Sequence, residues 1–280
     1  MDNVVAKKFG RKKQLKSKAV PIYPKSAERE MQRIVNAYMA EVIKYLRATA
    51  YGMMRADAWG MDKRQLDKLA ERVGLENRLR KVGYQVESQS FREWKKCVKE
   101  TLGVDLPESY YVGGIYEPDV NKWLLEMMKK MRELPGNTQA AVQKVIAQCV
   151  KKGKTVTEMR KAVDKKLASA KRMARLSAVA TIAALFGVLN RLQQSDAGCK
   201  KYYWKTARDN RVRPCHRALD GHIFEWDNPP EMWRETKHGI VYTGMRCNPG
   251  EDYGCRCVAI PVFEIDWLTL PNDERKGKNG

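Results

Sequence analysis

Apolar residues recur at three- and four-residue spacing through most of the first two hundred positions, which is the period of an amphipathic α-helix. The strongest stripe follows Ser26, a favourable N-cap after Pro24, and predicts a helix that ends near Gly52 or somewhat beyond it. Its apolar positions are Met31, Ile34, Val35, Tyr38, Met39, Val42, Ile43 and Leu46.

Helix-starting and helix-breaking residues predict the later elements. A second helix begins at Asp62, is weakened by Gly74 and stops at Gly83. The remaining helices are expected over residues 88–103, from Pro118 to Pro135-Gly136, from Asn137 or Thr138 to about Lys152, and from the Thr155–Glu158 capping box to Asp196, either unbroken or with one break near Ser169.

The pattern changes after Gly198. Residues 202–206 favour a strand, prolines and glycines punctuate the region up to Pro261, and residues 258–263 favour a final strand. The predicted fold is mainly α, with an N-terminal multi-helix body followed by a small turn-rich α+β module. The expected divisions are a flexible basic arm over 1–25, a helical domain over 26–197, the module over 198–270 and a polar tail over 271–280.

Charge narrows the class of partner. The chain holds 54 Lys and Arg against 33 Asp and Glu, a formal net charge of +21, so a polyanion is the first partner to consider and an anionic membrane surface the second. Residues 1–26 hold eight basic residues and one acid, and residues 151–175 hold ten and two. A solvated lysine surface explains either cluster alone; together they favour non-specific contact with double-stranded DNA. The candidate phosphate-binding residues are Lys7, Lys8, Arg11, Lys12, Lys13, Lys16, Lys165, Lys166, Lys171 and Arg172.

No apolar h-region follows the basic N-terminus, so a secretory signal is not expected. The longest apolar stretch, residues 176–189, is shorter than the roughly 18–20 residues that span a bilayer and is interpreted as a buried helix, which predicts no stable membrane span. Seven cysteines without an export signal then favour reduced thiols or metal ligands over a disulfide framework.

All three histidines and four of the seven cysteines lie in the module. Tetrahedral zinc takes four Cys or His ligands, and the candidates are Cys215, His216, Cys247, Cys255 and Cys257. The spacing is not that of a standard zinc finger, since a C-x-x-C pair is absent. The alternative is that these side chains only pack and hydrogen-bond in a loop-rich core.

Other chemistry has weaker support. Cys215, His216 and Asp220 lie close in sequence, but no protease signature surrounds them. A nuclease site built from His216, Asp220 and His222 around a metal suits the basic charge and lacks a nuclease signature. Asp220-Gly221 predicts a turn with positive φ at the glycine. Arginines 211, 213 and 217 either bind phosphates or pair with nearby aspartates and so tie the loops together. The second, structural role is favoured.

The module resembles the Mu F-like phage head morphogenesis proteins, a family of minor capsid proteins. The resemblance rests on a tryptophan, an Asp-x-Arg-Val-Arg run, a His-x-x-Leu-Asp-Gly run and a terminal Cys-Arg-Cys. Cys215 and Cys247 are additions to that pattern, and the Thr-Glu pair that relatives often carry in the preceding helix is absent. The matching positions are Trp204, Asp209, Arg211, Val212, Arg213, His216, Leu219, Asp220, Gly221, Tyr253, Gly254, Cys255, Arg256 and Cys257.

The resemblance implies a low-copy, non-enzymatic head protein that associates with the portal, with capsid or scaffold proteins and with packaged DNA. It implies a location in the capsid interior of the virion, and in the host cytoplasm during assembly. A role in genome packaging or ejection would fit. The alternative from a different class is a zinc-dependent nucleic-acid-binding protein or nuclease.

Overall fold

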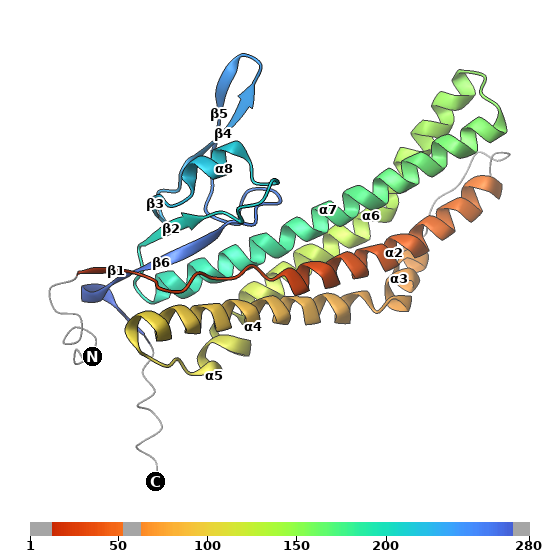
Figure 1. Ribbon diagram of the computed structural model, residues 1–280. Coiled ribbons are helices and arrows are strands. Elements are labelled where there is room, and N and C mark those ends of the chain that lie inside the picture. The colour runs from red at the N-terminus through yellow and green to blue at the C-terminus, as the bar shows by residue number, and fades with distance from the viewer. Residues whose placement is uncertain (1–12, 53–62, 271–280) are drawn as a thin grey trace, which may run out of the picture. The chain divides into compact units, whose positions relative to one another are not determined.

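The computed structural model describes residues 13–52 and 63–270, and the chain divides into two compact units (Figure 1). Within the described residues, unit 1 comprises 13–25, 84–120 and 182–270, and unit 2 comprises 26–52, 63–83 and 121–181. The strand-bearing module therefore belongs to the same unit as residues 84–120 and 182–197 of the predicted helical domain. The predicted domain boundary at residue 197 is not the boundary between the two units. The observed elements fit the predicted class, a mainly α chain with a small α+β module.

Helices build unit 2. It holds most of α2 (Lys25–Gly52), all of α3 (Lys63–Arg72), the start of α4 (Leu75–Leu102), most of α6 (Glu117–Lys151) and the first part of α7 (Val156–Asp196). The apolar stripe predicted for α2 is buried along its length, which confirms both the helix and its inward face. Burial of one face supplies most of the stability of such helices.

Two predicted helix ends are wrong. The helix α4 continues through Gly83, and α6 continues through Pro135-Gly136. The helix α7 is unbroken at Ser169, which is one of the two predicted alternatives. An interior glycine costs only about 1 kcal/mol relative to alanine, and Val82 and Val86 beside Gly83 are fully buried. An interior proline costs about 3 kcal/mol, yet the flanking Met131 and Val142 are also fully buried. Tertiary packing therefore overrides the local preference at both places.

A four-stranded antiparallel sheet lies in unit 1, with strand order β1-β6-β2-β3. Its strands are β1 (Gln14–Lys16), β2 (Lys201–Lys205), β3 (Ile223–Glu225) and β6 (Val258–Glu264). All seven residues of β6 are buried. Trp94 of α4 stacks on Phe263 with ring centroids 5.8 Å apart, and Gln194 of α7 donates to the carbonyl of Ala259 at 3.3 Å. The parts of α4 and α7 that belong to unit 1 therefore pack on β6.

The predicted flexible arm is wrong for residues 13–25. Strand β1 pairs with β6, and the chain after it binds α4: Lys18 N–H donates to Thr101 and Ile22 N–H donates to Glu93, both at 3.0 Å. Tyr23 packs edge-on against Phe186. The high content of lysine concealed this segment, because its few buried side chains do not form a periodic pattern.

The remaining short elements lie around the sheet. A helix of six residues, α8 (Pro214–Leu219), precedes β3, and a hairpin of β4 (Glu231–Thr236) and β5 (Gly239–Arg246) precedes β6. Every residue of β5 is exposed, so this strand adds little to the core. The chain also forms α5 (Glu108–Tyr110), a π-type turn (Tyr111–Ile115) and a 3-10 turn (Ile265–Trp267).

The long helix α7 meets the length and composition of a membrane span, with an 18-residue window of mean hydropathy 1.6. In the structure 61% of that window is buried. A core helix of a water-soluble protein meets the same criterion, so the hydropathy of α7 is weak evidence for a membrane span.

Candidate functional site

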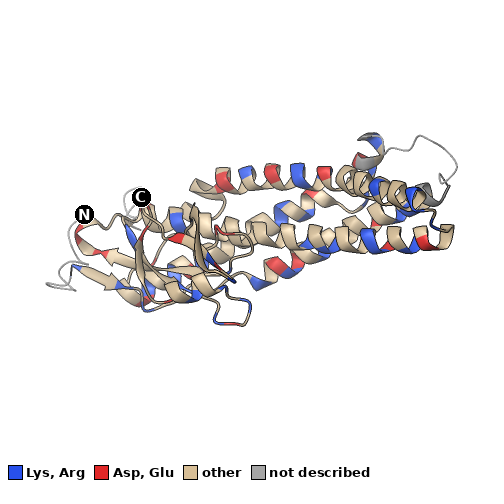
Figure 2. Ribbon diagram, turned by 90° about the horizontal axis from the view of Figure 1, so that it is seen from above, with Lys and Arg blue, Asp and Glu red and all other residues tan. Residues whose placement is uncertain are grey.

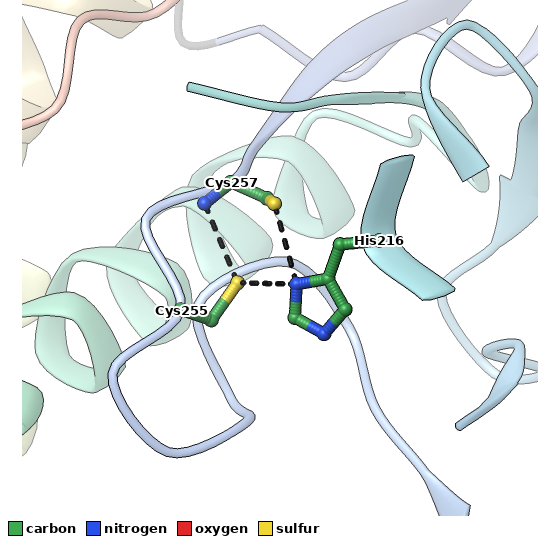
Figure 3. A group of neighbouring side chains, drawn as sticks. All are labelled: His216, Cys255 and Cys257. Atoms are coloured by element: carbon green, nitrogen blue, oxygen red, sulfur yellow. Dashed lines mark hydrogen bonds between the residues drawn. The ribbon is translucent and has the colours of Figure 1, made fainter. Parts of the chain in front are cut away.

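Three buried side chains of the module converge on one point (Figure 3). The Nδ1 atom of His216 lies 3.5 Å from Sγ of Cys255 and 3.5 Å from Sγ of Cys257. All three potential ligand atoms lie within 4.8 Å of one another. Two residues of the Cys-Arg-Cys run and one residue of α8, about forty positions earlier in the chain, therefore form a single cluster.

Backbone geometry sets the cluster in place. Pro214 begins α8, a position that suits proline, and His216 follows in its first turn. The loop from Cys247 to Cys257 turns at Gly250 (φ +93°) and Gly254 (φ +69°), a region that favours glycine. Gly250 also lies against α7, since a Cβ placed on it would be 2.7 Å from the carbonyl oxygen of Ala183. The helix thus supports the loop that carries both cysteines.

The far side of the imidazole is held by a carboxylate. Nε2 of His216 lies 3.0 Å from Oδ2 of Asp252, and Arg213 binds both that carboxylate and the carbonyl of Tyr253. An ionised carboxylate only accepts, so Nε2 carries the hydrogen, and in the neutral ring Nδ1 then presents its lone pair to the sulfur atoms. The edge of His216 packs on Trp204 at a centroid distance of 5.4 Å, which fixes the plane of the ring.

The electrostatics favour a thiolate beside a histidine. A hydrogen bond from Cys257 lowers the pKa of Cys255 well below its usual value, against burial and with further help from His216. Burial alone would lower the pKa of His216, but the hydrogen bonds to Asp252 and Cys255 outweigh it and raise that pKa to about 9. The bond with Cys255, together with burial, raises the pKa of Cys257. Without a metal, these directions favour a Cys255 thiolate paired with a protonated His216 beside a Cys257 thiol.

Two of the five predicted metal ligands do not join this group. Cys215 and Cys247 are buried in the surrounding apolar cluster with Trp204 and Trp226. Among the residues that the structure describes, the metal-binding group contains His216, Cys255 and Cys257 only. The neighbours of His216 in sequence point elsewhere because successive residues of a helix project in different directions. All seven cysteines are free thiols.

The proposed nuclease grouping is not formed either. The metal-binding group in the described part of the chain includes neither Asp220 nor His222. Asp220 accepts from the backbone N–H of Thr206 at 2.8 Å and pairs with Arg208, and His222 is exposed. Gly221 has φ +85°, which confirms the predicted turn.

The other motif residues connect the loops around the cluster. Arg256 donates from one nitrogen to both oxygens of Asp209, at 2.9 and 2.6 Å, and Arg211 lies 3.9 Å from the same carboxylate. Arg217 donates to the carbonyl of Val212 at 3.3 Å. These contacts bear out the structural use predicted for the arginines. The sequence analysis did not predict Asp252 as the partner of His216. The one feature of the sequence that could have indicated it is the position of Asp252 between the two halves of the motif.

A small cavity of about 60 Å³ opens beside the cluster. His216, Cys255 and Cys257 are among the residues that line it. Its other walls are formed by Ala207, Arg211, Val212, Arg213, Gly254 and Arg256.

The predicted phosphate contacts fall in different places. Lys7, Lys8, Arg11 and Lys12 lie outside the described residues, and Lys13 and Lys16 are exposed at β1. On α7 in unit 2, Lys165, Lys166 and Arg172 are exposed and Lys171 is half-buried. Figure 2 shows basic residues spread along the helices, with acidic residues among them.

A groove of about 460 Å³ in unit 2 brings basic residues of two helices together. Lys44 and Arg47 of α2 line it opposite Lys171 of α7. Arg47 also pairs with Asp164 at 2.9 Å. Sequence reasoning missed Lys44 and Arg47, because their cluster forms only when the two helices meet.

Comparison with known proteins supports the resemblance read from the motif. The profile described as "Phage Mu protein F like protein" matches residues 140–260, a range that contains the histidine and both cysteines of the cluster. A protein of Haemophilus influenzae named "Uncharacterized protein" is 26% identical over 193 residues. That alignment covers 69% of this chain and 39% of the relative, so this chain matches well under half of the relative's length. No solved structure matches.

Proposed function

We propose that this protein is a minor head protein of a phage, which acts in head morphogenesis as a structural component and not as an enzyme. The observation that carries the proposal is the Mu F-like match over residues 140–260. Residues of the motif bind one another across the module, through the Asp209–Arg256 pair and the His216 cluster. These contacts hold the loops of the module together, which agrees with a structural rather than an enzymatic function of the protein.

We further propose the capsid interior as its location, with the portal, capsid or scaffold proteins and packaged DNA as partners. Before assembly it would occur in the host cytoplasm. The basic charge supports contact with DNA, because +21 on a chain of 280 residues repels itself unless a polyanion neutralises part of it. The groove of Lys44, Arg47 and Lys171, with exposed Lys165 and Lys166 on the same helix α7, is the proposed phosphate contact in unit 2.

The head function is tested in an infected or induced host. The protein should co-purify with portal and procapsid, and should be found in purified virions by mass spectrometry. A strain that lacks the gene should form defective heads or non-infectious particles, and a plasmid copy should rescue it. Absence from both procapsids and virions, with normal infectivity of the deletion strain, would overturn the proposal.

The DNA contact is tested by the salt dependence of binding to duplex fragments of several sequences. Each neutralised phosphate contributes about −0.9 to the log–log slope. Changing Lys165, Lys166, Lys171 and Arg172 to glutamine should flatten the slope. Changing Lys122, Lys129, Lys130 and Lys144 to glutamine removes the same charge from α6 and is the matched control. Equal effects of the two sets, or a strong preference for one sequence, would contradict the proposed contact.

A nuclease is the second candidate, since three potential metal ligands line a cavity that also holds arginines. Plasmid DNA incubated with the protein and added Mg²⁺, Mn²⁺ or Zn²⁺ discriminates between the two. A head protein should leave the plasmid intact. Cleavage that is lost in His216→Ala would favour the nuclease.

A further inference from the structure

We propose that His216, Cys255 and Cys257 bind one zinc ion through Nδ1 and the two Sγ atoms. Zinc bonds are about 2.3 Å to sulfur and 2.0–2.1 Å to nitrogen, so a tetrahedral ion separates a sulfur and a nitrogen ligand by about 3.6 Å. The two distances from Nδ1 to sulfur are both 3.5 Å. Both nitrogen–sulfur edges of the cluster therefore already have the spacing of a zinc tetrahedron, and all three ligand atoms lie within 4.8 Å of one another.

Ordinary hydrogen bonding explains this arrangement less well. Nδ1 makes one directed hydrogen bond, whether it accepts with its lone pair or, in the protonated ring, donates its N–H, so it serves one sulfur well and not two. Both sulfurs nevertheless lie at the same distance from it. A shared ion on which all three lone pairs converge accounts for the equal distances.

The surroundings of Cys255 suit a thiolate ligand. The backbone N–H groups of Gly250 and Cys257 both donate to its sulfur, at 3.4 and 3.3 Å. Such donors stabilise negative charge on sulfur within a buried site. Gly250 therefore serves the cluster as well as the turn, since its N–H is one of the two donors.

The surroundings of His216 suit a metal-bound imidazole. A ligating histidine usually donates its other N–H to a carboxylate, which fixes the tautomer and the orientation of the ring. Oδ2 of Asp252 lies 3.0 Å from Nε2, and the guanidinium of Arg213 forms an ion pair with the same carboxylate. Asp252 and Arg213 are therefore positioning residues of the site.

The three residues line a small cavity, which offers room for a fourth ligand. No further Cys, His, Asp or Glu of the described chain belongs to the group. The cavity of about 60 Å³ beside it exceeds the ~10–15 Å³ that one water needs. Two thiolates and an imidazole favour zinc over Mg²⁺ or Ca²⁺, which prefer oxygen. The proposed ion thus takes three protein ligands and one water, whatever the role of the protein in the phage head.

The test begins with elemental analysis of full-length protein purified without chelator from zinc-supplemented cells. We expect about one zinc per chain, and Cys255→Ser and Cys257→Ser should each lose it. Cys215→Ser and Cys247→Ser are matched controls, because they are equally buried in the same apolar cluster yet lie outside the trio, and they should keep it. Asp252→Asn should retain the ion with about 10–100-fold weaker affinity in competition with a chromophoric chelator.

Spectroscopy keeps the test independent of folding of the variants. X-ray absorption of the wild-type protein should show two sulfur neighbours near 2.3 Å and nitrogen or oxygen neighbours near 2.0 Å, the usual zinc distances. Less than about a tenth of an equivalent of zinc by elemental analysis would overturn the proposal, provided that a known zinc protein gives its full zinc content in the same assay. A disulfide between Cys255 and Cys257, found by thiol titration of the unfolded protein, would also overturn it, as would loss of zinc in the controls with retention in Cys255→Ser.

Discussion

At the scale of single residues, the motif acts by joining segments that lie far apart in the chain. Arg256 stands between the two cysteines of the cluster, and its guanidinium binds Asp209, which lies 47 positions earlier. The side chain of Arg256 is 15% exposed and that of Asp209 is 36% exposed. Such a pair is screened less than one on the open surface.

We expect Arg256→Ala to lower the free energy of unfolding by about 1–2 kcal/mol, because a charged hydrogen bond is lost. Asp209 then keeps the backbone N–H of Arg211, at 3.1 Å, and the distant guanidinium of that residue as partners. Arg211→Ala is the control, since its guanidinium is 67% exposed and lies 3.9 Å away, and it should cost less than about 0.5 kcal/mol. Urea denaturation measures both. Equal losses would show that the close contact adds nothing.

At the scale of elements, the cysteine-bearing loop and α7 approach each other through two glycines. A Cβ on Gly187 would lie 2.7 Å from the carbonyl oxygen of Pro249, and one on Gly250 would lie 2.7 Å from that of Ala183. Both obstacles are backbone atoms, which cannot rotate away. The approach therefore depends on the absence of a side chain at both positions.

Gly250→Ala should destabilise unit 1 by about 2–5 kcal/mol, because the new methyl group meets backbone and the residue must keep a positive φ. Gly254→Ala separates the two effects. Its φ is +69° and nothing lies within 4 Å, so it should cost only about 1–2 kcal/mol. Thermal or urea unfolding compares the two variants, and a Gly250→Ala loss no greater than that of Gly254→Ala would contradict the close approach.

The start of α7 is closed by the predicted capping box. Thr155 N–H donates to the carboxylate of Glu158 at 2.9 Å, and Glu158 N–H donates to the hydroxyl of Thr155 at 3.3 Å. Thr155→Ala should cost about 0.5–2 kcal/mol, the usual value of an N-cap. Thr157→Ala, in the same exposed turn, is the control and should change the unfolding midpoint little.

The cap should also depend on pH. Lys154 first, and then the backbone of Thr155, lower the pKa of Glu158 to about 2 from an ordinary 4.5. A lowered pKa in the folded state means that the stabilisation is complete above pH 4.5, declines as the pH falls and is lost near pH 2. The difference in stability between wild type and Glu158→Ala should shrink over this window. A difference that stays constant down to pH 2 would contradict the assignment.

At the scale of the whole molecule, the basic N-terminal region includes residues that belong to the fold. Residues 14–16 belong to the sheet, and residues 18–23 bind α4 and α7. A deletion that tests the effect of basic charge on DNA binding, without removing part of the fold, therefore has to end before Lys13.

Deleting residues 1–12 should flatten the salt dependence of DNA binding, by up to about 0.9 in the log–log slope for each Lys or Arg that contacts a phosphate. It should leave the thermal midpoint nearly unchanged, because β1 remains. Deleting residues 1–24 should lower the midpoint, since it removes β1 from β6 and Tyr23 from Phe186. Equal midpoints for the two truncations, measured by circular dichroism, would contradict the role of β1.

Features that depend on near neighbours were predictable from the sequence. The stripe of α2, the Thr155–Glu158 cap, the turn at Gly221 and the resemblance of the module all follow from residues a few positions apart or from a dense motif. The stripe, the cap and the turn need no knowledge of what packs against them, because their hydrogen bonds and periodicity are local. The resemblance needs only the order and spacing of the motif residues.

The tertiary structure alone decided what lies far apart in the chain. It joined β1 to β6 across about 250 positions, carried α4 and α6 through Gly83 and Pro135, and selected Cys255 and Cys257 over Cys215 and Cys247 as partners of His216. Composition shows that five candidate ligands exist, but their directions are set by the backbone of α8, by two glycine turns and by support from α7. Long-range burial outweighs a local preference of about 1–3 kcal/mol, which is why the sequence alone could not decide these points.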